Sequence, residues 1–447
     1  MTGPEHHILA PCKAPSVMGP VVSGDPGRSG THAVVSPFVA EAVAHRRQAT
    51  RSDQWAALLT VWKRPLVIAV GVTVALRVIS ELVALVSVYG TSFPHIVARK
   101  PDVLITVWNR WDTGYYLVIA QHGYPTAHAA GAVGGSLPRF IAFGPLYPAL
   151  IWLAHAVLGT GLYATGQLVS AGAMVVAVAG LVYLTGLDGG PSQAGTAVML
   201  LVAFPTAFFL VADYPDSLAL ACTVWAFIAA RHRHWVLAGL VAAGAFMTKY
   251  YFAIAVVALL VEVWEARSGS SGQAVPRRRA FGWAVEVAVP TLAAGIAWMV
   301  FSAHRYGDAL AFVHVQSLWG RHFAFPWTLA WTTAGDLVHL RFLDTGTASV
   351  MELFDAVTVV LLVVVAVYSF LRVRRSYGIM LGLAVCIFTF QSILYSETRE
   401  VLALFPLFIG GARWVDGHPW RERAVLALFI PASYFLISRF VTGRFAG

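Results

Sequence analysis

Charged residues and cysteines are both scarce in this sequence of 447 residues. Only 12% of the residues are charged, whereas a soluble domain has roughly 25%. With 58% hydrophobic residues and a mean hydropathy of +0.69, the composition excludes an ordinary soluble domain and indicates a polytopic membrane protein. The cysteines Cys12, Cys222 and Cys386 are too far apart in the sequence to indicate a disulfide framework or a metal site.

Several sequence motifs of known chemistry are also missing. The chain has no HExxH, no paired CxxC and no glycine-rich nucleotide loop of the usual form. We therefore predict no metal site and no cofactor, and we expect any activated substrate to be carried by a lipid instead of a soluble nucleotide. Residues 1–50 contain no apolar run long enough for a secretory signal. Their richness in Pro, Gly, Ser, Ala and His predicts that residues 1–60 are a disordered cytoplasmic tail.

The net charge of +9 is concentrated in short basic runs beside apolar segments. Such runs are typical of topology signals in membrane proteins and not of a nucleic-acid-binding face. Basic residues from His45 to Arg51, followed by Lys63 and Arg64, precede the first apolar segment at about 65–89. The positive-inside rule therefore predicts a multi-pass protein of the cell membrane with a cytoplasmic amino end.

The apolar segments predict an all-α fold, a transmembrane helical bundle at residues 61–441 with about 11 spans. Outer loops are expected at 90–140 and 304–350. We expect re-entrant or interfacial helices inside these loops, and a short tail at 442–447.

Three apolar segments after the first loop present a problem of parity. They lie at 141–159, 162–186 and 194–213. The first outer loop precedes them and the turn at Asp213–Asp216 follows them, and both are expected on the outer side, so the chain must cross the membrane an even number of times between them. One segment must therefore fail to span. Pro145 and Pro148 near its start favour 141–159.

A longer apolar segment, 235–264, has basic flanks at both ends. We predict a hairpin of two short helices that turns near residues 248–250 and brings Lys249 to the outer side. In the first span, Arg77 and Glu81 are spaced i and i+4, so they can pair on one helix face. A structural pair is expected there, although charge inside a membrane is also a hint of function.

The segment VWNRWDTGYYLVIAQHGY, residues 107–124, lies in the first outer loop and combines Arg110 and Asp112 with five Trp or Tyr rings. Such rings concentrate at membrane surfaces, so the two charged side chains are expected at the interface. Asp112 is the candidate catalytic residue. The alternative is that Arg110 and Asp112 are only salt-bridge partners.

The predicted topology gathers further polar side chains on the outer side. A carboxylate among several cations suits a lipid phosphate, so we expect Lys and Arg to hold the phosphate. Asp112 would then act as general base for an attacking hydroxyl. The candidate substrate-binding residues are Arg110, Asp213, Asp216, Lys249, Arg321, His322 and Arg399.

These residues also have structural explanations. Polar residues collect at the ends of spans because hydrocarbon excludes them. Asp213 or Asp216 can cap the helix that follows, and Lys249 and Arg399 can be interfacial cations. Glu397 is expected to pair with Arg399.

Four stretches occur in an order that matches a known family. They are RWDTGYYLVIAQHGY (Arg110 to Tyr124) followed by FGPLYP (Phe143 to Pro148), FPTAFFLVADYPDSLAL (Phe204 to Leu220), HWVLAGLVAAGAFMTK (His234 to Lys249) and REVLALFPLF (Arg399 to Phe408). Together, over about residues 60–441, they resemble the PIG-V-like mannosyltransferases of the GT-C superfamily, that is, the GPI mannosyltransferase 2 family and its bacterial relatives.

The resemblance implies a GT-C fold, a polyprenyl-phosphate hexose donor that is usually mannose, transfer on the outer face, and an essential aspartate in the first outer loop. That role falls on Asp112. Three positions depart from the family pattern. Lys249 replaces the usual Arg after Thr, which loses the bidentate fork. Pro215 and Asp216 replace Ser-Glu, and Gln121 stands where an acid is common.

The leading hypothesis is an inverting glycosyltransferase of the bilayer. It would use a polyprenyl-phosphate sugar donor and a glycolipid, glycan or protein acceptor, with no nucleic acid. A membrane transporter or lipid flippase is the alternative, because intramembrane charge and broken helices would serve it equally. Transporters often have two similar halves, whereas the charges here crowd one face. A structural subunit without chemistry would have no cavity behind Asp112.

Overall fold

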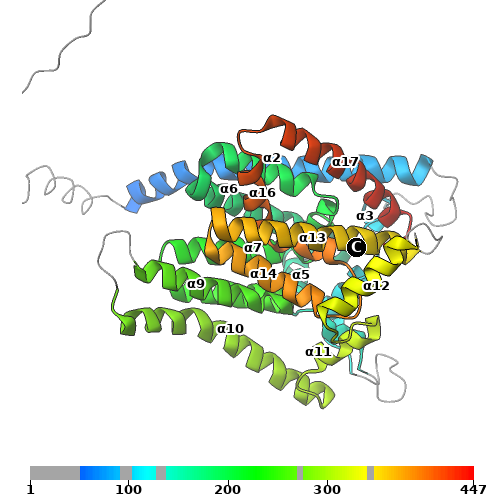
Figure 1. The fold of residues 1–447 in the computed structure, drawn as a ribbon. Helices are drawn as coiled ribbons and strands as arrows, with labels where there is room; N and C mark the ends of the chain where they lie inside the picture. Colours follow the sequence, from blue (N-terminus) through cyan, green and yellow to red (C-terminus); the bar gives the residue numbers. More distant parts are fainter. Residues whose placement is uncertain (1–50, 91–102, 127–136, 269–274, 340–346) are drawn as a thin grey trace, which may run out of the picture. The chain divides into compact units, whose positions relative to one another are not determined.

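The predicted all-α fold is confirmed by the computed structural model (Figure 1). The chain divides into Met1–Leu58 and Leu59–Gly447, and the second unit holds the helical bundle. The predicted disordered tail lies outside the described residues up to residue 50, and the first described helix begins at Arg51. The structure describes residues 51–90, 103–126, 137–268, 275–339 and 347–447, and within them it has helices and no named strand.

Five described helices are long and apolar enough to cross a membrane. About 20 apolar residues suffice, because each residue of an α-helix adds about 1.5 Å. The five are α2 (Arg51–Gly90), α6 (Leu162–Ala203), α10 (Arg277–Tyr306), α13 (Thr347–Arg372) and α17 (Pro419–Val441).

Shorter helices pack between the long ones. They are α5 (Leu146–Leu158), α7 (Asp216–Arg231), α8 (Trp235–Thr248), α9 (Ile254–Ser268), α14 (Arg375–Thr389) and α16 (Phe405–Val415). Helix α7 contacts α6 and α8, α14 contacts α13 and α9, and α16 contacts α6. The buried aromatic side chains of this core include Phe208, Phe227 and Phe405.

Helix α6 corrects the predicted segments at 162–186 and 194–213. It is continuous from 162 to 203 except for a kink at Gly190, whose φ of 84° is followed by Pro191. Proline interrupts the hydrogen bonding of a helix, and glycine adopts positive φ without steric cost. The chain leaves the helix at Ala203, so 204–213 is a turn region and not part of a span. Helix α5 has 13 residues, roughly 20 Å, but the part of α6 after Pro191 is equally short. Which segment fails to cross therefore stays a prediction.

The predicted hairpin at 235–264 is confirmed. Helix α8 ends at Thr248, Lys249 is extended with φ −145° and ψ 117°, and a 3₁₀ turn (η3, Tyr250–Ala253) leads into α9. Gly144 makes this turn possible, because a Cβ atom at 144 would lie 2.5 Å from the Thr248 carbonyl oxygen. The chain before α5 thus packs directly against the backbone that presents Lys249.

The predicted outer loops contain short helices, as expected. The first loop holds α3 (Val103–Thr106) and α4 (Thr113–His122), and η1 (Arg139–Ala142) begins at its end. The second loop holds α11 (Ala311–His314), η4 (Val315–Trp319) and α12 (Pro326–Val338). Figure 1 shows α3, α11 and α12 at the same end of the bundle.

The predicted pair of Arg77 and Glu81 is confirmed, and it also fixes the first loop. Trp108 is fully buried and donates a hydrogen bond to Glu81 over 2.9 Å. Arg77 donates to the Gln167 side chain over 2.6 Å and to the Val211 carbonyl over 2.8 Å. Helix α2 therefore ties the start of the first loop to α6 and to the turn before α7.

Candidate active site

A cavity of about 940 Å³ lies where the two predicted outer loops meet the ends of α8 and α14. Its wall is largely aromatic and apolar, with Tyr116, Phe246, Phe312 and Phe388 among the lining residues. Its ionisable acids and bases are Asp112, Arg139, Lys249, Arg321, His322, Glu397, Arg399 and Glu400. Five of the predicted site residues are thus brought together.

Asp112 is held immediately before α4 by an unusual backbone. Trp111 has a φ of 53°, in the left-handed region that non-glycine residues rarely adopt. An aspartate at this position commonly caps the helix, but the Asp112 side chain makes no cap hydrogen bond. Its Oδ2 atom instead pairs with Arg399 over 2.8 Å. Arg110 is therefore not its salt-bridge partner among the described residues.

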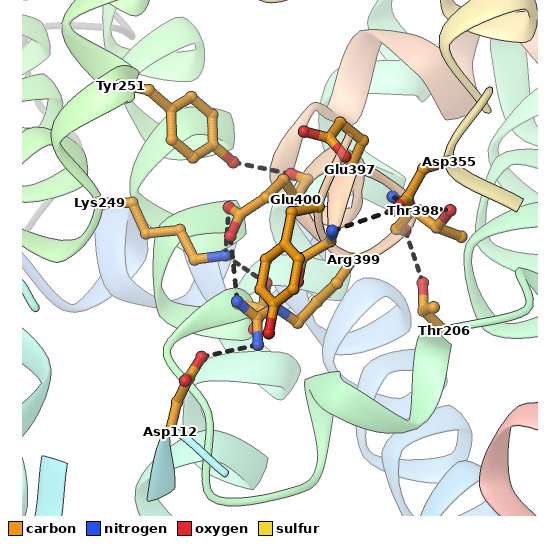
Figure 2. A network of polar contacts seen from close by, with 12 residues as sticks. Asp112, Thr206, Lys249, Tyr251, Asp355, Glu397, Thr398, Arg399 and Glu400 are labelled. Atoms are coloured by element: carbon orange, nitrogen blue, oxygen red, sulfur yellow. Dashed lines mark hydrogen bonds and ion pairs between the residues drawn. The ribbon is translucent and has the colours of Figure 1, made fainter. Parts of the chain in front are cut away.

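Arg399 continues a chain of ion pairs that sequence reasoning did not foresee (Figure 2). Its second terminal nitrogen lies 3.2 Å from Glu400 Oε1. Glu400 Oε2 lies 2.7 Å from Lys249 Nζ, which is also 2.6 Å from Asp216 Oδ1. Three acids and two bases alternate from Asp112 to Asp216, although they come from four separate parts of the chain.

Within this series of ion pairs, each charged side chain stabilises the charged form of its neighbours. Burial alone would raise the pKa of Glu400, but Lys249 and Arg399 lower it to about 2. Burial opposes the charge of Arg399, yet the neighbouring Asp112 and Glu400 raise its pKa. The Arg399 guanidinium also lies 5.4 Å above the Phe209 ring and 5.3 Å above the Tyr214 ring.

The turn that carries Arg399 and Glu400 is anchored from three sides (Figure 2). Asp355 of α13 accepts hydrogen bonds from the Ser396 and Thr398 amides and from the Thr398 hydroxyl, over 2.7–3.0 Å. The Thr206 hydroxyl donates to the Thr398 carbonyl over 2.7 Å. The Tyr251 hydroxyl donates to the carbonyl of Glu400, also over 2.7 Å. These bonds fix the direction of both charged side chains.

Three predicted site residues do not line the cavity: Arg110, Asp213 and Asp216. Arg110 contributes its carbonyl, which accepts the Tyr214 hydroxyl over 2.9 Å. Asp213 is fully buried, and burial raises its pKa to about 7 even though Gln167 and Arg77 act to lower it. Asp216 does not line the cavity itself but forms an ion pair with Lys249, which does. No side-chain cap bond is made at the start of α7, so neither aspartate acts as its cap.

Arg321 and His322, the remaining two predicted site residues, also line the cavity. Arg321 donates to the carbonyl of Tyr395 and lies 5.7 Å above its ring. The His322 amide donates to the Ser392 hydroxyl over 3.0 Å. Neither Arg321 nor His322 has a carboxylate within ion-pair distance in the part of the chain that the structure describes.

Sequence reasoning missed Glu400 and assigned Glu397 wrongly. Glu397 does not pair with Arg399 but accepts a hydrogen bond from Gln391. Within SETRE both acids are near Arg399 in sequence, and only the fold decides which one faces Lys249. Arg139, which stacks 5.6 Å from the Trp319 ring, also lines the cavity and was not among the predicted site residues. Its position at the end of the first predicted outer loop was the available signal.

Metal-ligating side chains do not cluster among the described residues. No group of three or more His, Cys, Asp or Glu there has the arrangement of a metal site.

One known family matches part of the chain. Residues 142–304 match the family described as dolichyl-phosphate-mannose-protein mannosyltransferase. The match includes Lys249 and Asp216 but not Asp112 or Arg399. No curated protein sequence matches the chain.

Several solved structures are similar at low identity. ArnT from Cupriavidus metallidurans bound to undecaprenyl phosphate is 15% identical, with 83% of this chain and 78% of that chain covered and a TM-score of 0.46. The Archaeoglobus fulgidus oligosaccharyltransferase in the apo form is 12% identical, with 84% and 56% covered and a TM-score of 0.43. AglB from the same organism, in complex with an inhibitory peptide and a dolichol-phosphate, is 13% identical, with 84% and 56% covered and a TM-score of 0.42. The chain thus spans little more than half the length of the oligosaccharyltransferase. The chain is thus similar to a mannosyltransferase family over residues 142–304, and five of its described helices are long and apolar enough to cross a membrane.

Proposed function

We propose that the protein transfers a hexose, with mannose as the first candidate, from a polyprenyl-phosphate donor to a hydroxyl acceptor on the outer face of the membrane, with inversion. The observation that carries the proposal is the common cavity of Asp112, Lys249 and Arg399, within an aromatic and apolar wall. The matched family's description, which names dolichyl-phosphate mannose, supports the donor class. The resemblance to PIG-V-like enzymes supports mannose and the role of Asp112.

The proposed reaction is a single displacement at the anomeric carbon. The acceptor oxygen forms a bond to that carbon while the bond from the carbon to the phosphate oxygen breaks, and polyprenyl phosphate leaves with the electron pair. The acceptor proton passes to Asp112, which acts as general base. Oδ2 of Asp112 is held by Arg399, and no described donor contacts Oδ1, so one oxygen is available to accept the proton.

Negative charge on the departing phosphate requires cations placed beforehand. Lys249 and Arg399 are already neutralised by Glu400, Asp112 and Asp216. We therefore assign the phosphate to the side of the cavity where Arg139 and Arg321 lie, with Arg399 between phosphate and base. Guanidinium groups suit this task because their fork matches two phosphate oxygens.

The membrane face assigned to the cavity follows from the distribution of basic residues. The cavity lies at the end of the bundle where α8 ends, and the basic flanks of the α8–α9 hairpin belong to the opposite end. Because basic loops stay in the cytoplasm, the cavity is assigned to the outer face. The apolar side chains Phe246, Phe312 and Phe388 provide the surface for the polyprenyl chain.

The test uses the purified full chain with radiolabelled polyprenyl-phosphate mannose and a panel of glycolipid, glycan and peptide acceptors. We expect Asp112→Asn to lower the rate of transfer by roughly 10²–10⁴-fold, the usual contribution of a general base. The matched control is Asp308→Asn, an acid that pairs with His314 over 2.7 Å outside the cavity. That variant should retain transfer.

Equal transfer by wild type and Asp112→Asn would remove Asp112 as the base. Transfer from polyprenyl-phosphate glucose alone would correct the hexose while leaving the reaction class. Absence of transfer with every donor, together with movement of labelled lipid across vesicles, would favour the transporter or flippase instead.

A further inference from the structure

A second cavity lies at the other end of the bundle. Its volume is about 300 Å³, and it is lined by Arg231, Arg372, Arg374 and Arg413 together with Asp188 and Gln193. Helix α7 shows the separation: it begins with Asp216, in the chain of ion pairs, and ends with Arg231, in this second cavity. The two ends are roughly 22 Å apart along the helix axis.

The four arginines come from four different helix ends. Arg231 is the last residue of α7, Arg372 the last of α13, Arg374 the residue before α14, and Arg413 lies in the last turn of α16. The positive-inside rule explains why basic residues occur at this end. It does not explain why guanidinium groups from four helices border one cavity.

Carboxylates neutralise only part of this cluster. Asp188 lies 2.7 Å from Arg231 and also accepts the Tyr377 hydroxyl over 2.6 Å. Glu262 and Glu265 lie 2.8 and 2.9 Å from Arg374. These acids are therefore already occupied by hydrogen-bonded partners.

The other two arginines are available. Arg372 and Arg413 have no carboxylate within ion-pair distance among the described residues, and both are exposed. Asp416, one turn beyond Arg413, accepts the side-chain amide of Gln193 over 2.7 Å. Two guanidinium groups thus border the cavity beside a wall of two fixed arginines.

We propose that this second cavity binds a phosphate-bearing anion, with Arg372 and Arg413 as the donors and Arg231 and Arg374 as the fixed cationic wall. Guanidinium forks donate two parallel hydrogen bonds to phosphate oxygens. The chemistry is the same for the headgroup of an anionic phospholipid and for free phosphate. Basic pockets between membrane helices on the cytoplasmic side take such headgroups, and this end of the bundle carries the basic runs.

The experiment compares ligands and variants on the purified full chain. In one arm, native mass spectrometry of detergent-solubilised protein counts bound phosphatidic acid against phosphatidylcholine. In the other, equilibrium dialysis measures binding of radiolabelled inorganic phosphate. The test variant is Arg372→Gln with Arg413→Gln. The control is Arg277→Gln with Arg278→Gln, which removes the same charge from exposed residues at the start of α10 and outside the cavity.

Wild type should retain phosphatidic acid over phosphatidylcholine, and the test variant should weaken that binding roughly tenfold or more, as expected for lost charge-assisted bonds. The control should stay within about twofold of wild type, because distant exposed charges are screened. If wild type binds inorganic phosphate and the test variant does not, free phosphate is a sufficient ligand. If wild type binds phosphatidic acid but not inorganic phosphate, the ligand is the lipid headgroup.

Two results would overturn the proposal. One is no preference of wild type for either phosphate probe. The other is an equal loss in test and control variants, which means general attraction to a basic surface. If the double test variant unfolds, Arg413→Gln alone carries the same comparison, because that exposed side chain makes no described ion pair.

Discussion

Replacing Glu400 by glutamine tests whether the chain of ion pairs holds the site together. The substitution keeps the shape of the side chain but removes the charge that lies 2.7 Å from Lys249 and 3.2 Å from Arg399. Both cations are then left partly buried with fewer anions around them. Breaking one partner out of a buried pair typically costs about 3–5 kcal/mol.

The depressed pKa of Glu400 also indicates how much its charge contributes to the free energy of folding. The pKa of Glu400 is about 2 instead of 4.5, and one pKa unit corresponds to about 1.4 kcal/mol, so the ionised form contributes about 3 kcal/mol to folding. Because the folded pKa is depressed, this contribution is present in full above about pH 4.5 and is lost as the pH falls towards 2.

The assay is unfolding of purified protein in mixed micelles by titration with SDS, followed by tryptophan fluorescence. At pH 7, Glu400→Gln should lower the free energy of unfolding by about 3 kcal/mol, and the difference from wild type should shrink below about pH 4.5. Glu422→Gln is the control, since Glu422 in the first turn of α17 has no described partner. Equal stability of Glu400→Gln and wild type at pH 7, or a difference that grows in acid, would refute the reasoning.

Three further substitutions address the surroundings of the same site. Arg399→Lys removes the fork that holds Asp112 and should lower kcat for transfer roughly 100-fold by misplacing the base; an unchanged kcat would contradict this. Gly144→Ala places a Cβ atom 2.5 Å from the Thr248 carbonyl, so SDS titration should show a loss of about 1–3 kcal/mol. Asp213 has a pKa raised from 3.8 to about 7, so folding loses stability as the pH rises from about 4 to about 7, where the unfolded chain has ionised and the folded protein still holds the proton. Asp213→Asn should raise the free energy of unfolding by up to about 4 kcal/mol at pH 8 and leave it unchanged at pH 4. A stabilisation seen at pH 4 and not at pH 8 would contradict this prediction.

The features predicted correctly depend on short-range patterns. The basic flanks of 235–264 require the chain to turn back within it, and the turn occurs at Lys249 as predicted. The i, i+4 spacing of Arg77 and Glu81 places both on one helix face in any helix, so their pair was also predictable. The end of α6 at Ala203 was missed because the apolar run continues to 213. Pro205 was the available local signal, since a proline disfavours helical backbone at the residue before it, and Phe204 has a ψ of 140°.

The gathering of five predicted residues at one cavity was predictable, but their partners were not. Asp112, Lys249 and Arg399 line one cavity, as the topology implied. Lys249 pairs with Glu400, 151 positions away, and no pattern in a single sequence specifies such a contact. The same limit applies to Glu397 and Glu400: both belong to one short turn, and the choice between them depends on Asp355 anchoring that turn.

Left-handed backbone at Trp111 and Ser396 makes the shapes of two separate turns depend on each other. Each conformation costs about 1–3 kcal/mol relative to a relaxed one, and each lies within three residues of a partner in the Asp112–Arg399 ion pair. That ion pair is one of the contacts that keep both turns distorted. A substitution that separates Arg399 from Asp112 therefore also relieves strain in the two turns, so the position of the base and the shape of both turns depend on one contact. Hydrogen exchange at both turns should accelerate together in Arg399→Lys.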